Sequence, residues 1–70
     1  MNVYFSTELP ESGQFVCVWT HKDNVWCDTY KWIDGAIHQY SEVDDNFIPL
    51  RKTGQPWTWT DKCKFITMLK

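Results

Sequence analysis

A period-two alternation of large side chains in residues 14–20 constrains the fold more than any other feature of the sequence. In an extended chain the odd-numbered Phe15, Cys17 and Trp19 fall on one face, and the intervening valines fall on the other. Both sets are apolar, as is typical of a strand that other parts of the protein cover on both sides. We therefore expect residues 14–20 to form a central β-strand.

A second run of aromatic residues, Trp26, Tyr30 and Trp32, shares one face of an extended chain with Asp28. A helix would scatter these residues around its axis. On a solvated face they would be typical of a protein-contact surface, where tyrosine and tryptophan are enriched. On a core face, Asp28 would need a partner or a place at the wet end of the strand. The sequence leaves both interpretations open, and these four residues are the predicted partner-binding site.

Two polar segments punctuate these runs and predict tight hairpins. The pair Asp34-Gly35 lies between apolar residues and suits the positive φ angles of a type I′ turn. Residues 21–24 form a polar segment of hairpin length between the first two strands. With a third strand over 36–40, residues 14–40 are predicted to form an antiparallel meander.

The remaining segments give weaker signals. Residues 1–6 alternate loosely and predict a short opening strand, while 47–50 contain Pro49 and suit an edge or irregular position. Residues 41–46 are compatible with a turn or with a single helical turn. Residues 60–69 alternate as a strand would, but they could also place an apolar face on a helix; we favour the strand.

Length and composition predict one small domain that spans residues 1–70. A chain of this size buries only about 60% of its unfolded surface, so its core needs large side chains. Aromatic residues make up 17% of the sequence and bury about 150–250 Å² each. The predicted fold class is mainly β, or small α+β, with an antiparallel meander of three to five strands and at most one short helix.

Charge and cysteine content limit the possible partners and the cellular compartment of the protein. The formal net charge is −2 and no basic run is present, so nucleic acid is not an expected partner. No apolar run approaches the roughly 20 residues that a membrane span requires. Three cysteines cannot form a complete disulfide framework, and no signal peptide is visible. We expect a cytoplasmic protein with reduced thiols and no membrane association.

No set of residues predicts a metal site, a cofactor or a catalytic centre. Ligand-type side chains are spread along the chain without a Cys-x-x-Cys pair, at Cys17, His21, Cys27, His38 and Cys63. Buried free cysteines that act as small hydrophobes explain this spacing better than zinc does. No glycine-flanked nucleophile or phosphate-binding loop is present, so the chain is not expected to be an enzyme.

Several landmarks occur in an order that is shared with a known family. They are Leu9-Pro10-Glu11, Gly13, Val16-Cys17-Val18, Tyr30, Trp32, Asp34, Gly35, Val43 and Phe47-Ile48-Pro49-Leu50. Over about residues 4–50 this order resembles a group of small phage and prophage proteins, domain of unknown function family 551. The sequence departs from that pattern at residues 44–47, where the family has Thr-His-Trp. The resemblance implies a phage or prophage origin, and hence the host cytoplasm, but it supplies no activity and no functional residues.

Together, these features predict a non-enzymatic, protein-binding accessory factor. It would be phage-encoded and would inhibit or modulate a host or phage protein. One alternative is a structural module that forms a homodimer through its edge strands. A small zinc-binding domain is a further alternative.

Overall fold

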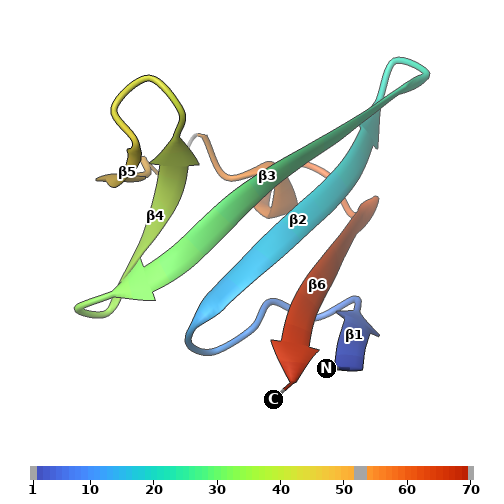
Figure 1. The fold of residues 1–70 in the computed structure, drawn as a ribbon. Coiled ribbons are helices and arrows are strands. Elements are labelled where there is room, and N and C mark those ends of the chain that lie inside the picture. The colour runs from blue at the N-terminus through green and yellow to red at the C-terminus, as the bar shows by residue number, and fades with distance from the viewer. Residues whose placement is uncertain (1, 52–53, 70) are drawn as a thin grey trace.

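The protein forms a single antiparallel β-sheet in a computed structural model that describes residues 2–51 and 54–69 (Figure 1). The order of its six strands is β1-β6-β2-β3-β4-β5. Their bounds are β1 (Asn2–Ser6), β2 (Gln14–His21), β3 (Asn24–Ile33), β4 (Ala36–Ser41), β5 (Asn46–Pro49) and β6 (Cys63–Leu69). A 3₁₀ turn, η2 (Pro56–Thr58), precedes β6. The mainly β, antiparallel fold class is confirmed, and the sheet reaches six strands because the short segments at both edges also pair.

The two predicted hairpins are present, and both have two-residue turns. Asp34 and Gly35 have φ angles of 51° and 78°, and Ile33 pairs with Ala36 on either side of them. Consecutive positive φ angles define the type I′ geometry that matches the twist of the flanking strands. The turn between β2 and β3 is of the same kind, since Lys22 and Asp23 have φ angles of 49° and 65°.

The last described segment is a strand, as favoured from its alternation. β6 lies between β1 and β2 and pairs antiparallel with both. Its residues alternate between the two faces of the sheet: Cys63 and Phe65 are buried, while Lys64 is exposed. The strand therefore has one face in the core and one face outside it.

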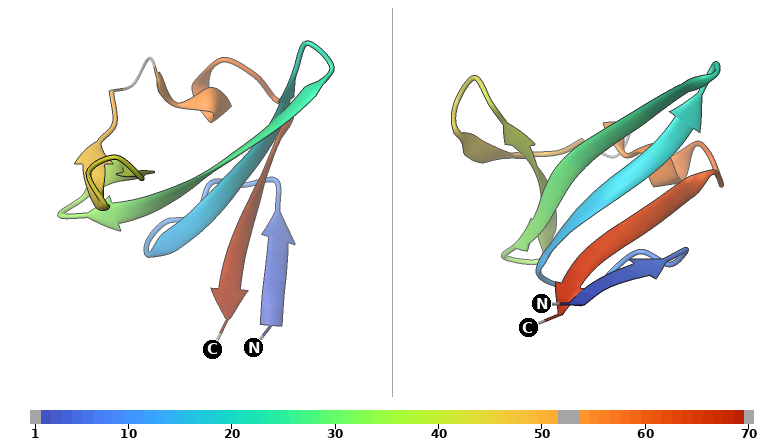
Figure 2. Two further views of the ribbon diagram at one scale, coloured as in Figure 1. Left: turned by 45° about the horizontal axis from the view of Figure 1, so that its top comes forward. Right: turned by 45° about the vertical axis from the view of Figure 1, so that its right-hand side comes forward.

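The core lies on one face of the sheet. Its buried residues are Phe15, Cys17, Tyr30, Ile37, Cys63 and Phe65. The ring of Phe15 stacks on Tyr30 at a centroid distance of 5.6 Å, and both rings contact Trp57 edge-on. Trp57 belongs to η2, which lies on one side of the sheet in both views of Figure 2. Offset and edge-on aromatic contacts of this kind add to the free energy of burial.

The expectation that residues 14–20 would be covered on both sides is corrected. β2 is central, between β6 and β3, but only the face that carries Phe15 and Cys17 is buried. Val16 and Val18 on the opposite face are only half-buried. The cover of the core face comes from loop residues such as Leu9 and Leu50 and from η2. The described residues contain no α-helix that could form a second layer on the other face.

Candidate functional site

The four predicted partner-binding residues share one face of β3, the face that forms the core. The register pairs Tyr30 with the buried Phe15, and Asp28 with Cys17. Exposure rises from Tyr30 toward the β2–β3 turn: Tyr30 is 1% exposed, Asp28 is half-buried and Trp26 is 50% exposed. Trp32, near the other end of the strand, is half-buried. The face is therefore core near the middle of the strand and surface toward the β2–β3 turn.

Tyr30 and Trp32 hold the fold together. Besides stacking on Phe15, Tyr30 meets the ring of Trp57 at a centroid distance of 5.0 Å. Burial raises the pKa of its phenol above the ordinary value. The Nε1–H of Trp32 donates a 2.8 Å hydrogen bond to the carbonyl oxygen of Pro10, which ties the loop before β2 to the sheet. A role for Tyr30 in partner binding is thus corrected, because its side chain is not accessible in the folded chain.

Asp28 is the half-buried carboxyl group on this face. Loss of solvent around it raises its pKa above the reference value of 3.8. A carboxyl group whose pKa is raised by folding stabilises the fold while it is protonated. That contribution is lost as the pH rises through the folded-state pKa. Ionised Asp28 therefore works against folding at neutral pH.

Replacing Asp28 by asparagine is expected to increase the stability at pH 7, by up to about 1 kcal/mol. The amide keeps the shape of the carboxyl group without its charge, so the gain should vanish at a pH well below 3.8, where Asp28 is protonated in both states. Urea unfolding at the two pH values measures the difference. Asp61→Asn, at an exposed position, is the matched control and should change little. A loss of stability at neutral pH would show that the carboxylate has a stabilising partner.

Four aromatic side chains gather where the core face reaches the β2–β3 turn, and we call them the hairpin-end patch: Trp19, His21, Trp26 and Trp59. Trp19 and Trp26 are paired across β2 and β3. The rings of His21 and Trp59 make an edge-on contact at 5.9 Å. Trp26 is 50% and Trp59 is 49% exposed. Half-exposed indoles are among the side chains that contribute most to protein interfaces.

Trp59 did not stand out in the sequence. It alternates with Trp57 in Trp57-Thr58-Trp59, so periodicity alone treats the two tryptophans alike. The η2 turn separates them, because it packs Trp57 against the core and leaves Trp59 on the surface. The only sequence signal for this turn is Pro56, which suits the first position of a helical turn.

Cys17 and Cys63, the two buried cysteines, are poorly suited to nucleophilic chemistry. Burial, with a smaller contribution from the neighbouring Cys63, raises the pKa of Cys17 to about 12, and burial also raises the pKa of Cys63. Thiols with raised pKa values are poor nucleophiles, because the thiolate is the reactive form. In the ranges that the structure describes, no three His, Cys, Asp or Glu side chains are placed to hold a metal ion.

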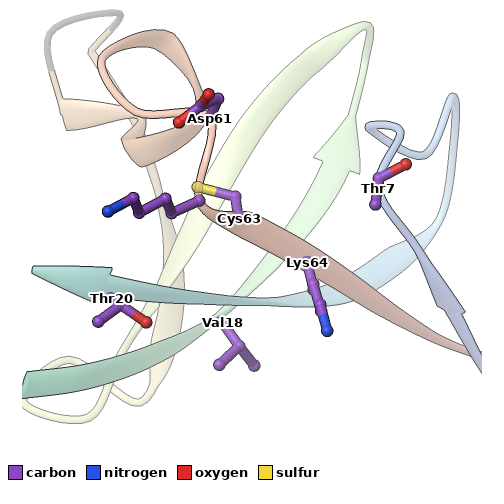
Figure 3. Close-up of a pocket in the computed structure, with 7 residues that line it drawn as sticks. Thr7, Val18, Thr20, Asp61, Cys63 and Lys64 are labelled. Carbon is purple, nitrogen blue, oxygen red and sulfur yellow. The ribbon is translucent and has the colours of Figure 1, made fainter.

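A surface hollow of about 410 Å³ lies where β2 and β6 run side by side. Figure 3 shows Val18 and Lys64 on one side of the strands, and Asp61 and Cys63 on the other. The side chains around it therefore do not converge on one point, as the groups of a catalytic site must.

No helix within the described residues has the length and apolar character needed to cross a membrane.

The fold and its surface define a small antiparallel β domain with a one-sided aromatic core and two half-exposed tryptophans at one hairpin end. The chain matches no family model, and comparisons with curated proteins and with solved structures give no significant match.

Proposed function

We propose that this protein is a non-enzymatic, protein-binding domain that contacts its partner through the hairpin-end patch. The observation that carries the proposal is the half exposure of Trp26 and Trp59, at 50% and 49%. Tryptophan is one of the residue types enriched among side chains that dominate binding free energy. Burial of these two indoles by a partner would remove a large apolar area from water.

The placement of the patch favours tight binding. Trp19 and Trp26 are paired on neighbouring strands, and the His21–Trp59 contact links the patch to the segment before β6. Side chains that are already held in place lose little conformational entropy on binding. In line with the family that the sequence resembles, we further propose a phage-encoded accessory factor that modulates a host or phage protein in the cytoplasm.

Alanine at Trp26 or Trp59 is expected to weaken partner binding at least about tenfold each. The test captures a partner from a bacterial lysate, identifies it by mass spectrometry, and measures the Kd for the purified pair by calorimetry. Circular dichroism should stay unchanged, because both side chains lie at the surface. Val43→Ala, at a side chain that is 95% exposed in the turn after β4, is the control and should bind as the unmodified protein does. Unchanged affinity in both tryptophan variants would exclude the hairpin-end patch.

A homodimer through β1 is the second candidate function. β1 pairs with β6 on one side, and no described strand pairs with its other side. The segment Asn2–Ser6 contains neither a charged residue nor proline, the features that usually protect an edge strand, whereas β5 at the other edge contains Pro49. Sedimentation velocity over a wide range of protein concentrations tests this candidate, and a strict monomer would exclude it.

A further inference from the structure

The sheet face opposite the core carries a second apolar surface. By strand register, five of its side chains lie together, and we call them the open-face patch: Val16, Val18, Val25, Cys27 and Ile66. Val16 is paired with Ile66 on β6, and Val18 is paired with Cys27 on β3. The patch therefore spans three adjacent strands at the centre of the sheet.

Nothing in the described part of the chain covers the open-face patch. Val25 is 71% exposed, Cys27 is exposed, and the three remaining side chains are half-buried. The η2 turn and the segment that leads to it lie behind β2 and β3 in Figure 1, on the core side. Because a sheet in a globular protein normally buries its apolar faces against another layer, a bare face of this kind is suited to a partner.

The charges on this face have one sign. At the described strand positions that share it, the ionisable side chains are Lys31, His38, Tyr40, Lys64 and the thiol of Cys27, and none is an aspartate or glutamate. Lys64 is paired with Val18, and Lys31 is paired with Gln14 at the other end of β2. The two lysines thus flank the valines of β2 on opposite sides.

Carboxylates approach this face only from the loops at its border, among the described residues. Asp45 accepts a hydrogen bond from the hydroxyl of Tyr40, whereas Asp61 lies on the other side of the strands from Lys64 (Figure 3). Among the described strand residues, the one acidic side chain, Asp28, lies on the core face, whereas both lysines, Lys31 and Lys64, lie on this face. The surface is therefore complementary to an apolar partner that carries negative charge.

We propose that the open-face patch binds an acidic amphipathic helix of a partner protein, which lies along β2. The apolar stripe of such a helix would pack on Val16, Val18 and Ile66, and its flanking carboxylates would reach Lys31 and Lys64. β2 has 8 residues and is about 26 Å long, which corresponds to about 17 residues of α-helix. A second copy fits less well, because it would bring the lysines of both copies into one interface. Nucleic acid also fits less well, because two lysines neutralise few phosphates.

This inference goes beyond the proposed function because the two surfaces lie on opposite faces of the sheet. Trp19 and Trp26 of the hairpin-end patch are on the core side, and Val18 and Cys27 are on the open side. One partner can therefore occupy each face at the same time. Loss of one contact would leave the other unchanged, so the two proposals can fail independently.

The test uses a synthetic helical peptide of about 17 residues, with leucine along one face and glutamate beside it. A matched peptide carries lysine in place of each glutamate. In ¹⁵N-labelled protein, the acidic peptide should shift the amide signals of Val16, Val18, Cys27 and Ile66, and it should slow reaction of the exposed Cys27 thiol. Lys31→Glu together with Lys64→Glu should weaken binding at least about tenfold. Both lysines are exposed, so this variant should keep its fold, which circular dichroism checks.

Two variants serve as controls. Lys22→Glu makes the same charge change in the exposed β2–β3 turn and should leave the peptide affinity unchanged. Trp26→Ala alters the other patch and should also bind the peptide normally. The proposal is overturned if the open-face signals do not move, or if the lysine peptide binds as well as the acidic one. Tighter binding of a single-stranded oligothymidylate at these residues, or self-association through them without peptide, would equally overturn it.

Discussion

Tyr30→Ala is expected to remove about 3–5 kcal/mol of stability, the usual effect of deleting a large buried aromatic side chain. Tyr30 is 1% exposed and its ring contacts both Phe15 and Trp57, so the substitution leaves a cavity at the centre of the core. A chain of 70 residues typically has a free energy of unfolding of about 4–10 kcal/mol. The variant should therefore be largely unfolded or only marginally stable. Urea unfolding, followed by circular dichroism and tryptophan fluorescence, measures the change.

Two further variants serve as comparisons for Tyr30→Ala. Tyr30→Phe keeps the ring and should retain most of the stability. Trp26→Ala, on the same face of β3 but half-exposed, should lose only about 1 kcal/mol or less. If Tyr30→Ala were as stable as the unmodified protein, the face would not be the core, and a partner-binding role for Tyr30 would have to be considered again.

Raising the pH above about 9 is expected to unfold the protein progressively. Burial raises the pKa of Cys17 from the reference value of 9.0 to about 12, and burial raises the pKa of Tyr30 from its reference value of 10.0. Both groups are neutral when protonated, so burial in the folded state favours the protonated form of each group. Their contribution to stability is complete below the unfolded-state pKa values and is lost as the pH rises toward the folded-state values. The decline should therefore fall between about pH 9 and 12.

Stability measured by urea unfolding from neutral pH to about pH 11 tests this prediction. Cys17→Ala and Tyr30→Phe should each make the decline less steep, because each removes one of the groups that titrate. Cys27→Ala is the matched control, since Cys27 is exposed, and it should retain the slope of the unmodified protein. Equal slopes in all four proteins would show that the buried thiol and phenol do not govern alkaline stability.

The local signals in the sequence were sufficient for most of the strands. Asp34-Gly35 predicts a type I′ turn because few other dipeptides adopt two positive φ angles, and the structure has that turn. The alternation of residues 63–66 predicts a strand rather than a helix, and β6 has its buried and exposed residues in that order. These features depend on residues that are neighbours in the chain, so they can be predicted from a single sequence.

The side of the sheet that becomes the core could not be predicted in the same way. The two faces of β2 are both apolar, so periodicity alone does not distinguish Phe15 from Val16. Which face of β2 is buried depends on a segment that is distant in the sequence, because η2 places Trp57 against Phe15. The same long-range packing decides that Tyr30 is buried while Trp26 remains at the surface. Of the four residues predicted on β3, the sequence therefore could not show that Tyr30 is buried and that Trp26 is half-exposed.

The position of β6 between β1 and β2 has a consequence for how the chain folds. β6 is the last of the strands to be synthesised, and it pairs with the first, so that Asn2 lies opposite Leu69. Pairings between residues so far apart in the chain slow folding, because a long loop must close before any contact forms. Until β6 has left the ribosome, Phe15 and Cys17 lack their neighbours Phe65 and Cys63 and are less completely buried. The nascent chain thus passes through a stage in which one edge of β2 is open to chaperones or to aggregation.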